Sequence, residues 1–134
     1  MLFSSHNLSE KIKIFQLFLG LLISSILMAE QKPCQIFISS SMPDTAIQEY
    51  YNAIKSQPES RLIMRGLIEG SMMKTKAYIE RLKVVVDIDP PAFEDFDIKV
   101  VPTILIQEGE DHYYKHTGHV PVSYVLEKIQ ESKK

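Results

Sequence analysis

The chain has 134 residues, of which 45% are hydrophobic and 24% are charged, and its formal net charge is −2 at pH 7. This length predicts one compact domain, and the apolar content excludes a chain that is disordered throughout. The near balance of acidic and basic residues argues against a dedicated nucleic-acid-binding protein, which normally carries an excess of Lys and Arg. Because Cys34 is the only cysteine, the chain can form neither an internal disulfide nor a C-x-x-C redox or zinc motif.

The first thirty residues have the layout of a secretory signal. Lysines come before an apolar run over residues 14–28, and the small residue Ala29 is followed by polar residues. This order predicts a signal peptide over residues 1–29 and a folded domain over residues 30–134. The alternative is an uncleaved anchor, but the apolar run is shorter than the ~20 residues that cross a bilayer comfortably. We therefore expect an exported protein that meets a membrane only if this segment is retained.

Cys34 lies just after the predicted cleavage site and before the first predicted strand. The preceding Gln31-Lys32-Pro33 excludes a lipoprotein, because it lacks the small and aliphatic residues of a lipobox. An exposed or partly buried free thiol is the favoured interpretation. A disulfide between two chains is the alternative, since an odd cysteine in an oxidising compartment can pair between molecules.

Strands and helices alternate along the rest of the chain. Short β-rich apolar runs predict buried strands, and apolar residues spaced at i, i+3, i+4 and i+7 predict helices that each bury one face. This alternation predicts a layered α/β domain. The predicted strands cover residues 35–40, 61–68, 84–88, 100–106 and 112–117, and the predicted helices cover 45–57, 70–83, 92–96 and 120–130. In the second of these helices, Met72, Ala77, Ile79 and Leu82 are expected to face inward.

Two prolines mark the ends of elements that can form a site. The sequence Ser41-Met42-Pro43-Asp44 predicts a helix start with Ser41 at the N-cap. Pro102 cannot donate to a sheet ladder and therefore fits best at the first residue of the strand over 103–106. A cis peptide bond before Pro102 would make this a fixed kink beside the strand.

The order of these features resembles the thioredoxin fold. In that fold the redox pair C-x-P-C occupies the helix start, and a cis-proline faces it. In this chain Ser41 stands in place of the attacking thiol and Asp44 in place of the resolving thiol. The resemblance implies a three-layer α/β sandwich with a mixed sheet, a C-terminal β-hairpin, a final helix and one inserted helix over residues 70–83.

Five segments in order resemble the TrbC family of F-type conjugative pilus assembly proteins. This resemblance implies a redox-inactive periplasmic assembly factor of a type IV secretion system, with no enzymatic activity and no cofactor. It also implies binding to other transfer proteins, including a TraW-type periplasmic partner, and no nucleic-acid or small-molecule substrate. The segments are IFISSSMPD at 36–44, MRGLIEGS at 64–71, DIDPPAFEDFDI at 87–98, VVPTILI at 100–106 and GHVPVSYVLEKI at 118–129.

The helix start and the segment before Pro102 are expected to flank one groove. A serine hydroxyl is a poor nucleophile without an adjacent base, so helix capping is the favoured role of Ser41. An extended segment of another protein could pair with the backbone of Val101 by strand addition. The predicted groove residues are Ser41, Met42, Pro43, Asp44, Val101, Pro102 and Thr103.

Arg65 interrupts an apolar run and has two interpretations. A buried guanidinium needs a carboxylate partner, which Asp44, Asp87 or Asp89 could provide. Alternatively, strand alternation turns Arg65 toward solvent. Structural rather than functional roles are expected for Arg65, Gly66, Asp89, Pro90 and Gly118.

Two other kinds of function are weighed against partner binding. A thiol-disulfide oxidoreductase or isomerase could use Cys34, but this residue precedes the strand instead of following it at the helix start. A metal site could use Asp111, His112, His116 and His119, but these lack the compact spacing of metal ligands. Solvated histidines are the favoured interpretation, and no metal is expected.

Overall fold

The computed structural model describes residues 11–17 and 32–134. Residues 11–17 form a short helix within a unit that covers residues 1–31, and residues 32–134 form a second compact unit. Most of the predicted signal segment therefore lies outside the described residues, and its cleavage stays a prediction. Among the described residues, no helix combines the length and the apolar character needed to cross a membrane.

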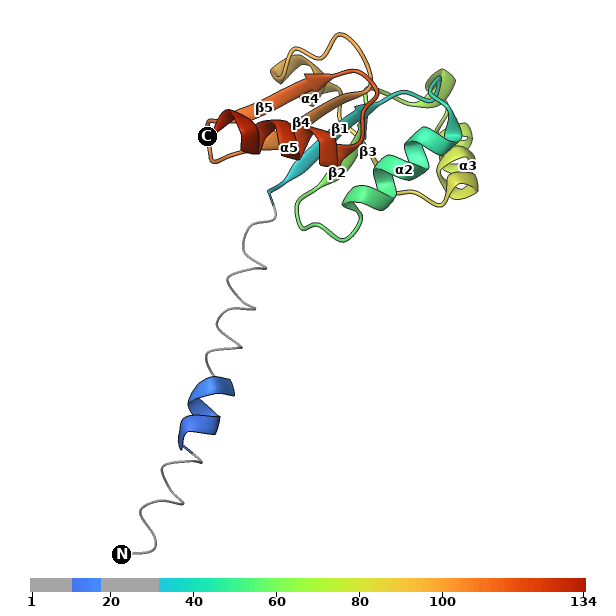
Figure 1. Ribbon diagram of the computed structural model, residues 1–134. Coiled ribbons are helices and arrows are strands. Elements are labelled where there is room, and N and C mark those ends of the chain that lie inside the picture. Colours follow the sequence, from blue (N-terminus) through green and yellow to red (C-terminus); the bar gives the residue numbers. More distant parts are fainter. Residues whose placement is uncertain (1–10, 18–31) are drawn as a thin grey trace, which may run out of the picture. The chain divides into compact units, whose positions relative to one another are not determined.

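In the second unit, strands and helices alternate in the predicted order (Figure 1). A single turn of 3₁₀ helix, η1, is inserted before the second long helix. The elements are β1 (Cys34–Ile38), α2 (Asp44–Ile54), β2 (Arg61–Met64), η1 (Ile68–Gly70), α3 (Met72–Leu82), β3 (Val86–Ile88), α4 (Pro90–Asp95), β4 (Thr103–Gln107), β5 (Tyr113–Thr117) and α5 (Val122–Ser132).

The five strands form one mixed sheet in the order β3-β2-β1-β4-β5. Strands β1, β2 and β3 run parallel to one another, whereas β4 runs antiparallel to β1 and forms a hairpin with β5. The carboxyl ends of the three parallel strands and the start of β4 therefore meet at the same edge of the sheet. Pairing of Phe37 with Thr103 fixes the register there.

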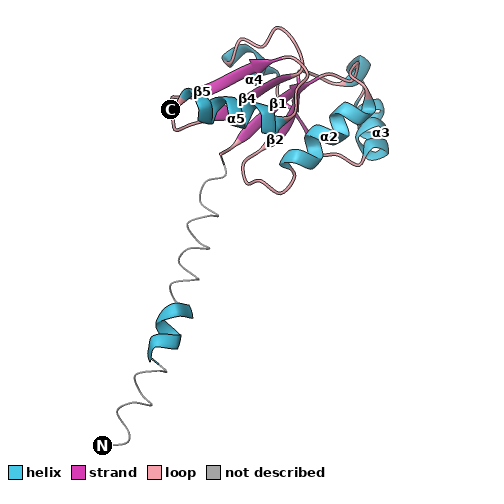
Figure 2. Ribbon diagram, in the orientation of Figure 1, coloured by secondary structure: helices cyan, strands magenta, loops and turns pink. Residues whose placement is uncertain are grey.

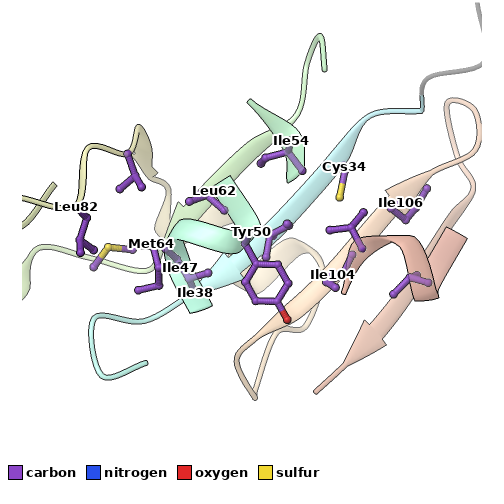
Figure 3. Packing of buried hydrophobic residues seen from close by; sticks show 14 of the residues in the cluster. Cys34, Ile38, Ile47, Tyr50, Ile54, Leu62, Met64, Leu82, Ile104 and Ile106 are labelled. Atoms are coloured by element: carbon purple, nitrogen blue, oxygen red, sulfur yellow. The ribbon is translucent and has the colours of Figure 1, made fainter. Parts of the chain in front are cut away.

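The sheet lies between two layers of helices (Figure 2). Alternation along β1 sends Ile36 and Ile38 to the face covered by α2 and α5, and sends Phe37 to the face covered by α4. Figure 3 shows part of the larger cluster, in which side chains of α2 and the central strands interdigitate. On the opposite face, the rings of Phe37 and Phe93 pack edge to face with their centroids 5.0 Å apart. The predicted three-layer sandwich is confirmed.

Two strands end earlier than the sequence predicts. β1 ends at Ile38 instead of residue 40, and β2 ends at Met64 instead of residue 68. The carbonyl of Met64 accepts the N–H of Asp89 at 3.0 Å, and the chain then leaves the sheet. The apolar residues that follow form η1, where the hydroxyl of Thr75 accepts the N–H of Ile68 at 2.9 Å.

The predicted capping role of Ser41 is wrong. Helix α2 has Pro43 at its N-cap and no side-chain cap. A tight turn precedes the helix, with the N–H of Met42 donating to the carbonyl of Ser39 at 3.1 Å. Instead, the hydroxyls of Ser41 and Ser39 form a hydrogen bond with each other, with their oxygens 2.9 Å apart.

The inward face of α3 also differs from the prediction. Leu82 is buried and Ile79 is half-buried, as expected, but Ala77 is exposed and the side chain of Met72 is 68% exposed. Thr75 is buried instead, because its hydroxyl donates to the carbonyl of Ser71 at 2.7 Å while it accepts from η1. The first turn of α3 thus packs on η1 through hydrogen bonds.

Candidate functional site

A groove of about 570 Å³ lies at the edge of the sheet where the parallel strands end. Its floor includes Ile38 and Met64, the last residues of β1 and β2. One wall comes from the segment between β2 and α3, and the other from α4 and the segment that leads to β4. The lining residues are Ile38, Ser39, Ser40, Met64, Arg65, Gly66, Leu67, Ile68, Glu69, Phe93, Ile98, Lys99 and Val101.

Val101 presents an unpaired backbone in this groove. The Val101–Pro102 peptide bond is cis, and β4 begins at the next residue, so Pro102 occupies the position predicted for it. Within residues 32–134, neither the N–H nor the C=O of Val101 has a hydrogen-bond partner. The carbonyl of Pro102, in contrast, accepts the N–H of Gly118 at 2.9 Å. Gly118 has a φ of 118°, which explains why a glycine stands there.

The helix start predicted as the other wall contributes little to the groove. Ser41 and Pro43 are exposed and Met42 packs against the larger core cluster, but none of the three lines the groove. Asp44 is the first residue of α2, and its carboxylate accepts a 2.5 Å hydrogen bond from Arg81 of α3. A hydroxyl and a paired carboxylate therefore stand where the sequence comparison with thioredoxins places two thiols.

Two further predicted groove residues are buried in the sheet. Pro102 and Thr103 are both buried, and neither lines the groove. The hydroxyl of Thr103 donates to the carbonyl of Val100 at 2.6 Å and lies 3.3 Å from the hydroxyl of Thr117. Of the seven residues predicted to form the groove, Val101 lines it, while Pro102 and Thr103 hold Val101 in position.

Arg65 is exposed, which decides between the two interpretations of this residue. None of the three proposed carboxylates pairs with it: Asp87 and Asp89 pair with Arg61, at 3.3 and 3.0 Å, and Asp44 pairs with Arg81. The guanidinium of Arg65 donates to the carbonyl of Ile98 at 3.2 Å and lies 5.1 Å from the centroid of the Phe93 ring. Arg65 belongs to the groove wall, where sequence reasoning gave it only a structural role. A basic residue directly after an apolar strand and before a glycine was the available signal.

The remaining structural predictions concern residues around the groove. Asp89 caps α4 by accepting the N–H of Ala92 at 3.2 Å, and Pro90 follows as the first helical residue. A Cβ built on Gly66 meets no atom within 4 Å, so this glycine serves no close approach of backbone. The position of α4 matters for the site because α4 supplies Phe93 to the groove.

Cys34 is buried and lies far from the groove. The prediction of an exposed or partly buried thiol is therefore wrong. It is 1% exposed and begins β1, whereas the groove lies at the end of this strand. Four residues of β-strand separate the two positions by roughly 13 Å. Figure 3 shows the thiol among aliphatic side chains of the larger cluster. Burial raises the pKa of Cys34 to about 12, which suppresses the thiolate that redox chemistry requires.

The histidines considered as metal ligands are spread over the surface. The ring of His116 packs near Tyr124, and the ring of His119 packs near Tyr50, with centroid separations of 5.9 and 5.6 Å. In the part of the chain that the structure describes, no three His, Cys, Asp or Glu side chains are grouped so that they could hold a metal ion.

The fold is similar to that of several solved structures, among them thioredoxin-like proteins. StoA from Bacillus subtilis is 17% identical, with a TM-score of 0.53 over 72% of this chain and 81% of that chain. The pneumococcal exposed lipoprotein thioredoxin from Streptococcus pneumoniae is 16% identical, with a TM-score of 0.58 over 75% and 84%. A protein described as a thiol:disulfide interchange protein DsbE, from Chlorobium tepidum, is 12% identical, with a TM-score of 0.53 over 75% and 79%. At these identities the similarity shows the thioredoxin-like fold alone.

Sequence comparison identifies the family. No curated protein is similar enough in sequence to count as a relative. The TrbC family, described as the type-F conjugative transfer system pilin assembly protein, matches residues 36–129. The matched range runs from β1 into α5 and contains the whole groove, including Val101 and Arg65. The chain therefore belongs to the TrbC family of pilin assembly proteins of type-F conjugative transfer systems.

Proposed function

We propose that this pilin assembly protein is a periplasmic docking protein without enzymatic activity. It binds an extended segment of another protein of the transfer system in the groove beside Val101. The segment adds to the backbone of Val101 as a short strand, and the groove receives its alternate side chains. A TraW-type protein is the partner that the family resemblance favours.

The unpaired backbone of Val101 is the observation that carries this proposal. An unpaired N–H and C=O just before the start of a strand offer a template for strand addition, since main-chain hydrogen bonds supply affinity and neighbouring pockets supply specificity. The groove combines polar residues with apolar ones, among them Leu67, Ile68 and Val101. Such a surface fits an aliphatic side chain that alternates toward the groove along a bound strand.

The alternative of a thiol-disulfide oxidoreductase or isomerase is disfavoured by Cys34. This thiol is buried, its pKa is raised to about 12, and it begins the strand whose other end reaches the groove. A catalytic cysteine needs a lowered pKa and access to its substrate. At the groove, Ser39 and Ser40 supply hydroxyls, and among the described residues the hydroxyl of Ser39 bonds to that of Ser41, which is not a base that could activate it.

Site-specific photo-crosslinking in cells that assemble the pilus tests the proposal. A photo-crosslinking amino acid replaces Lys99, whose exposed side chain lies at the groove, and the matched control replaces Lys55 at the end of α2. We expect position 99, and not position 55, to capture one transfer protein. Adding Val101→Glu should abolish this capture while the circular dichroism spectrum stays unchanged. Equal capture from both positions, or capture that survives Val101→Glu, would contradict the proposal.

A further inference from the structure

Arg65 is the one arginine that has no carboxylate partner among the described residues. The sequence contains three arginines, all within the described residues. Arg61 pairs with Asp87 and Asp89, and Arg81 pairs with Asp44. For Arg65, no carboxylate oxygen of the described residues lies within 4.0 Å, and its one hydrogen bond goes to the carbonyl of Ile98.

The guanidinium of Arg65 is held in place although it is exposed. Its Nη2 donates to the carbonyl of Ile98 at 3.2 Å, and its central carbon lies 5.1 Å from the centroid of the Phe93 ring. A guanidinium has five N–H donors in a planar fork, so most of its donors remain for another molecule. Because these two contacts already restrict the side chain, binding a carboxylate costs less conformational entropy than it would for a free arginine.

The charges around the groove favour an acidic occupant. Three charged residues line it: Arg65, Lys99 and Glu69. The carboxylate of Glu69 forms an ion pair with Lys74, and the ammonium of Lys99 lies 3.6 Å from Asp97, with both side chains highly exposed. The unpaired charge of the groove is therefore the positive charge of Arg65, on a chain whose net charge is −2.

We propose that Arg65 binds an Asp or Glu side chain of the extended segment that docks at Val101. This inference rests on the proposed function and specifies the chemistry of the partner segment: an aliphatic side chain for the apolar pocket and a carboxylate for Arg65. A carboxylate fits the guanidinium fork through two parallel N–H···O bonds, which fixes the register of the bound strand as well as adding affinity.

A peptide array tests this assignment directly. The array carries overlapping short peptides that cover the other proteins of the same transfer system, and each acidic peptide is printed again with Asn for Asp and Gln for Glu. It is probed with the full protein purified from its host cells, and with the variants Arg65→Gln, Arg65→Lys and Arg61→Gln. Arg61 is the matched control, because it lies on β2, the strand that ends just before Arg65, and is outside the groove.

We expect the bound peptides to lose about tenfold to a hundredfold in affinity either when their carboxylate is replaced by an amide or when Arg65 is replaced by Gln. The two losses should not add, because they remove the same interaction. Arg65→Lys should bind with intermediate affinity, since lysine keeps the charge and loses the fork. Arg61→Gln should bind like the wild type.

The outcomes separate this inference from the proposed function. Suppose that peptides bind the wild-type protein and that Val101→Glu abolishes this binding, but that neither amide replacement nor Arg65→Gln changes the affinity. The proposed role of Arg65 is then wrong, and the docking groove stands. If no peptide binds the wild-type protein, or if Val101→Glu leaves peptide binding unchanged, both proposals fail. Equal unfolding midpoints of wild type and Arg65→Gln show that a loss of binding is not a loss of folding.

Discussion

Arg81 of α3 and Asp44 of α2 are joined by a 2.5 Å hydrogen bond between Nη1 and Oδ2. This contact ties the inserted helix to the first residue of the helix that carries the redox pair in thioredoxins. The hydroxyl of Ser41, at the other end of that motif, is engaged with the hydroxyl of Ser39. The hydroxyl of Ser41 and the carboxylate of Asp44 are thus engaged within the protein, and we propose the free backbone at Val101 as the group that binds a partner.

The contact between Asp44 and Arg81 is expected to make a small contribution to stability. Asp44→Asn should lower the free energy of unfolding by about 0.3–1 kcal/mol, because a negative charge in the first turn of a helix is stabilising. Arg81→Gln should act in the same direction, and the two changes together should cost less than their sum. Urea unfolding of the four proteins at low salt measures this coupling. Strictly additive effects would show that the two side chains act independently.

The reactivity of Cys34 should depend on unfolding. A thiol reagent at neutral pH is expected to modify Cys34 slowly in the native protein and rapidly in denaturant, because the native thiol is buried and protonated. Absorbance of the released thiolate measures both rates. Rapid modification of the native protein would contradict this expectation and would support the alternative of an oxidoreductase that uses Cys34.

The raised pKa of Cys34 also predicts a dependence of stability on pH. Burial raises the pKa from the unfolded value of 9.0 to about 12 in the native protein. The native state therefore keeps a proton that the unfolded state loses, and stability falls as pH rises from about 9 to about 12. Comparison with Cys34→Ala isolates this effect from other groups that titrate in the same range. The variant should show a shallower fall of unfolding free energy across that window, and parallel curves would contradict the prediction.

Two glycines near the groove should respond differently to the same substitution. Gly118→Ala should lower the free energy of unfolding by about 1–3 kcal/mol, because Gly118 has a φ of 118° that a side chain disfavours. It should also weaken partner capture, since its N–H anchors the carbonyl of Pro102 next to Val101. The added methyl group of Gly66→Ala meets open space, so the free energy of unfolding of this variant should stay within about 0.5 kcal/mol of the wild type. Denaturant midpoints and crosslinking yields of both variants provide the comparison, and a tolerated Gly118→Ala would refute the anchoring role.

The sequence predicts the fold well because each element has a strong local signal. Ile47, Tyr50 and Ile54 recur at helical spacing in the sequence and form the buried face of α2. Pro102 directly precedes β4, as the loss of its N–H requires. Local signals fail where contacts between residues distant in the sequence determine where a strand ends. The apolar run after Met64 looks like more strand, but it leaves the sheet and forms η1, where the N–H of Ile68 donates to the hydroxyl of Thr75 in α3.

The site was harder to predict than the fold. Its groove brings together residues from β1, the segment after β2, α4 and the segment before β4, and only the folded chain shows that these are neighbours. Ser41 looks like a cap in a sequence window, yet Pro43 takes the N-cap position after a turn. Arg65 could not be placed on either face from alternation, because β2 ends one residue before it.

Hydrogen–deuterium exchange tests the central claim most directly. The captured transfer protein is added to the full protein, and exchange is followed over the segment that contains Val101 and over the outer surfaces of α2 and α5. Strand addition predicts strong slowing of exchange at the backbone of residues 99–101, and no change on the outer helix surfaces. Formation of a stable complex without slowing at Val101 would contradict the account, because the partner would then dock elsewhere on the protein.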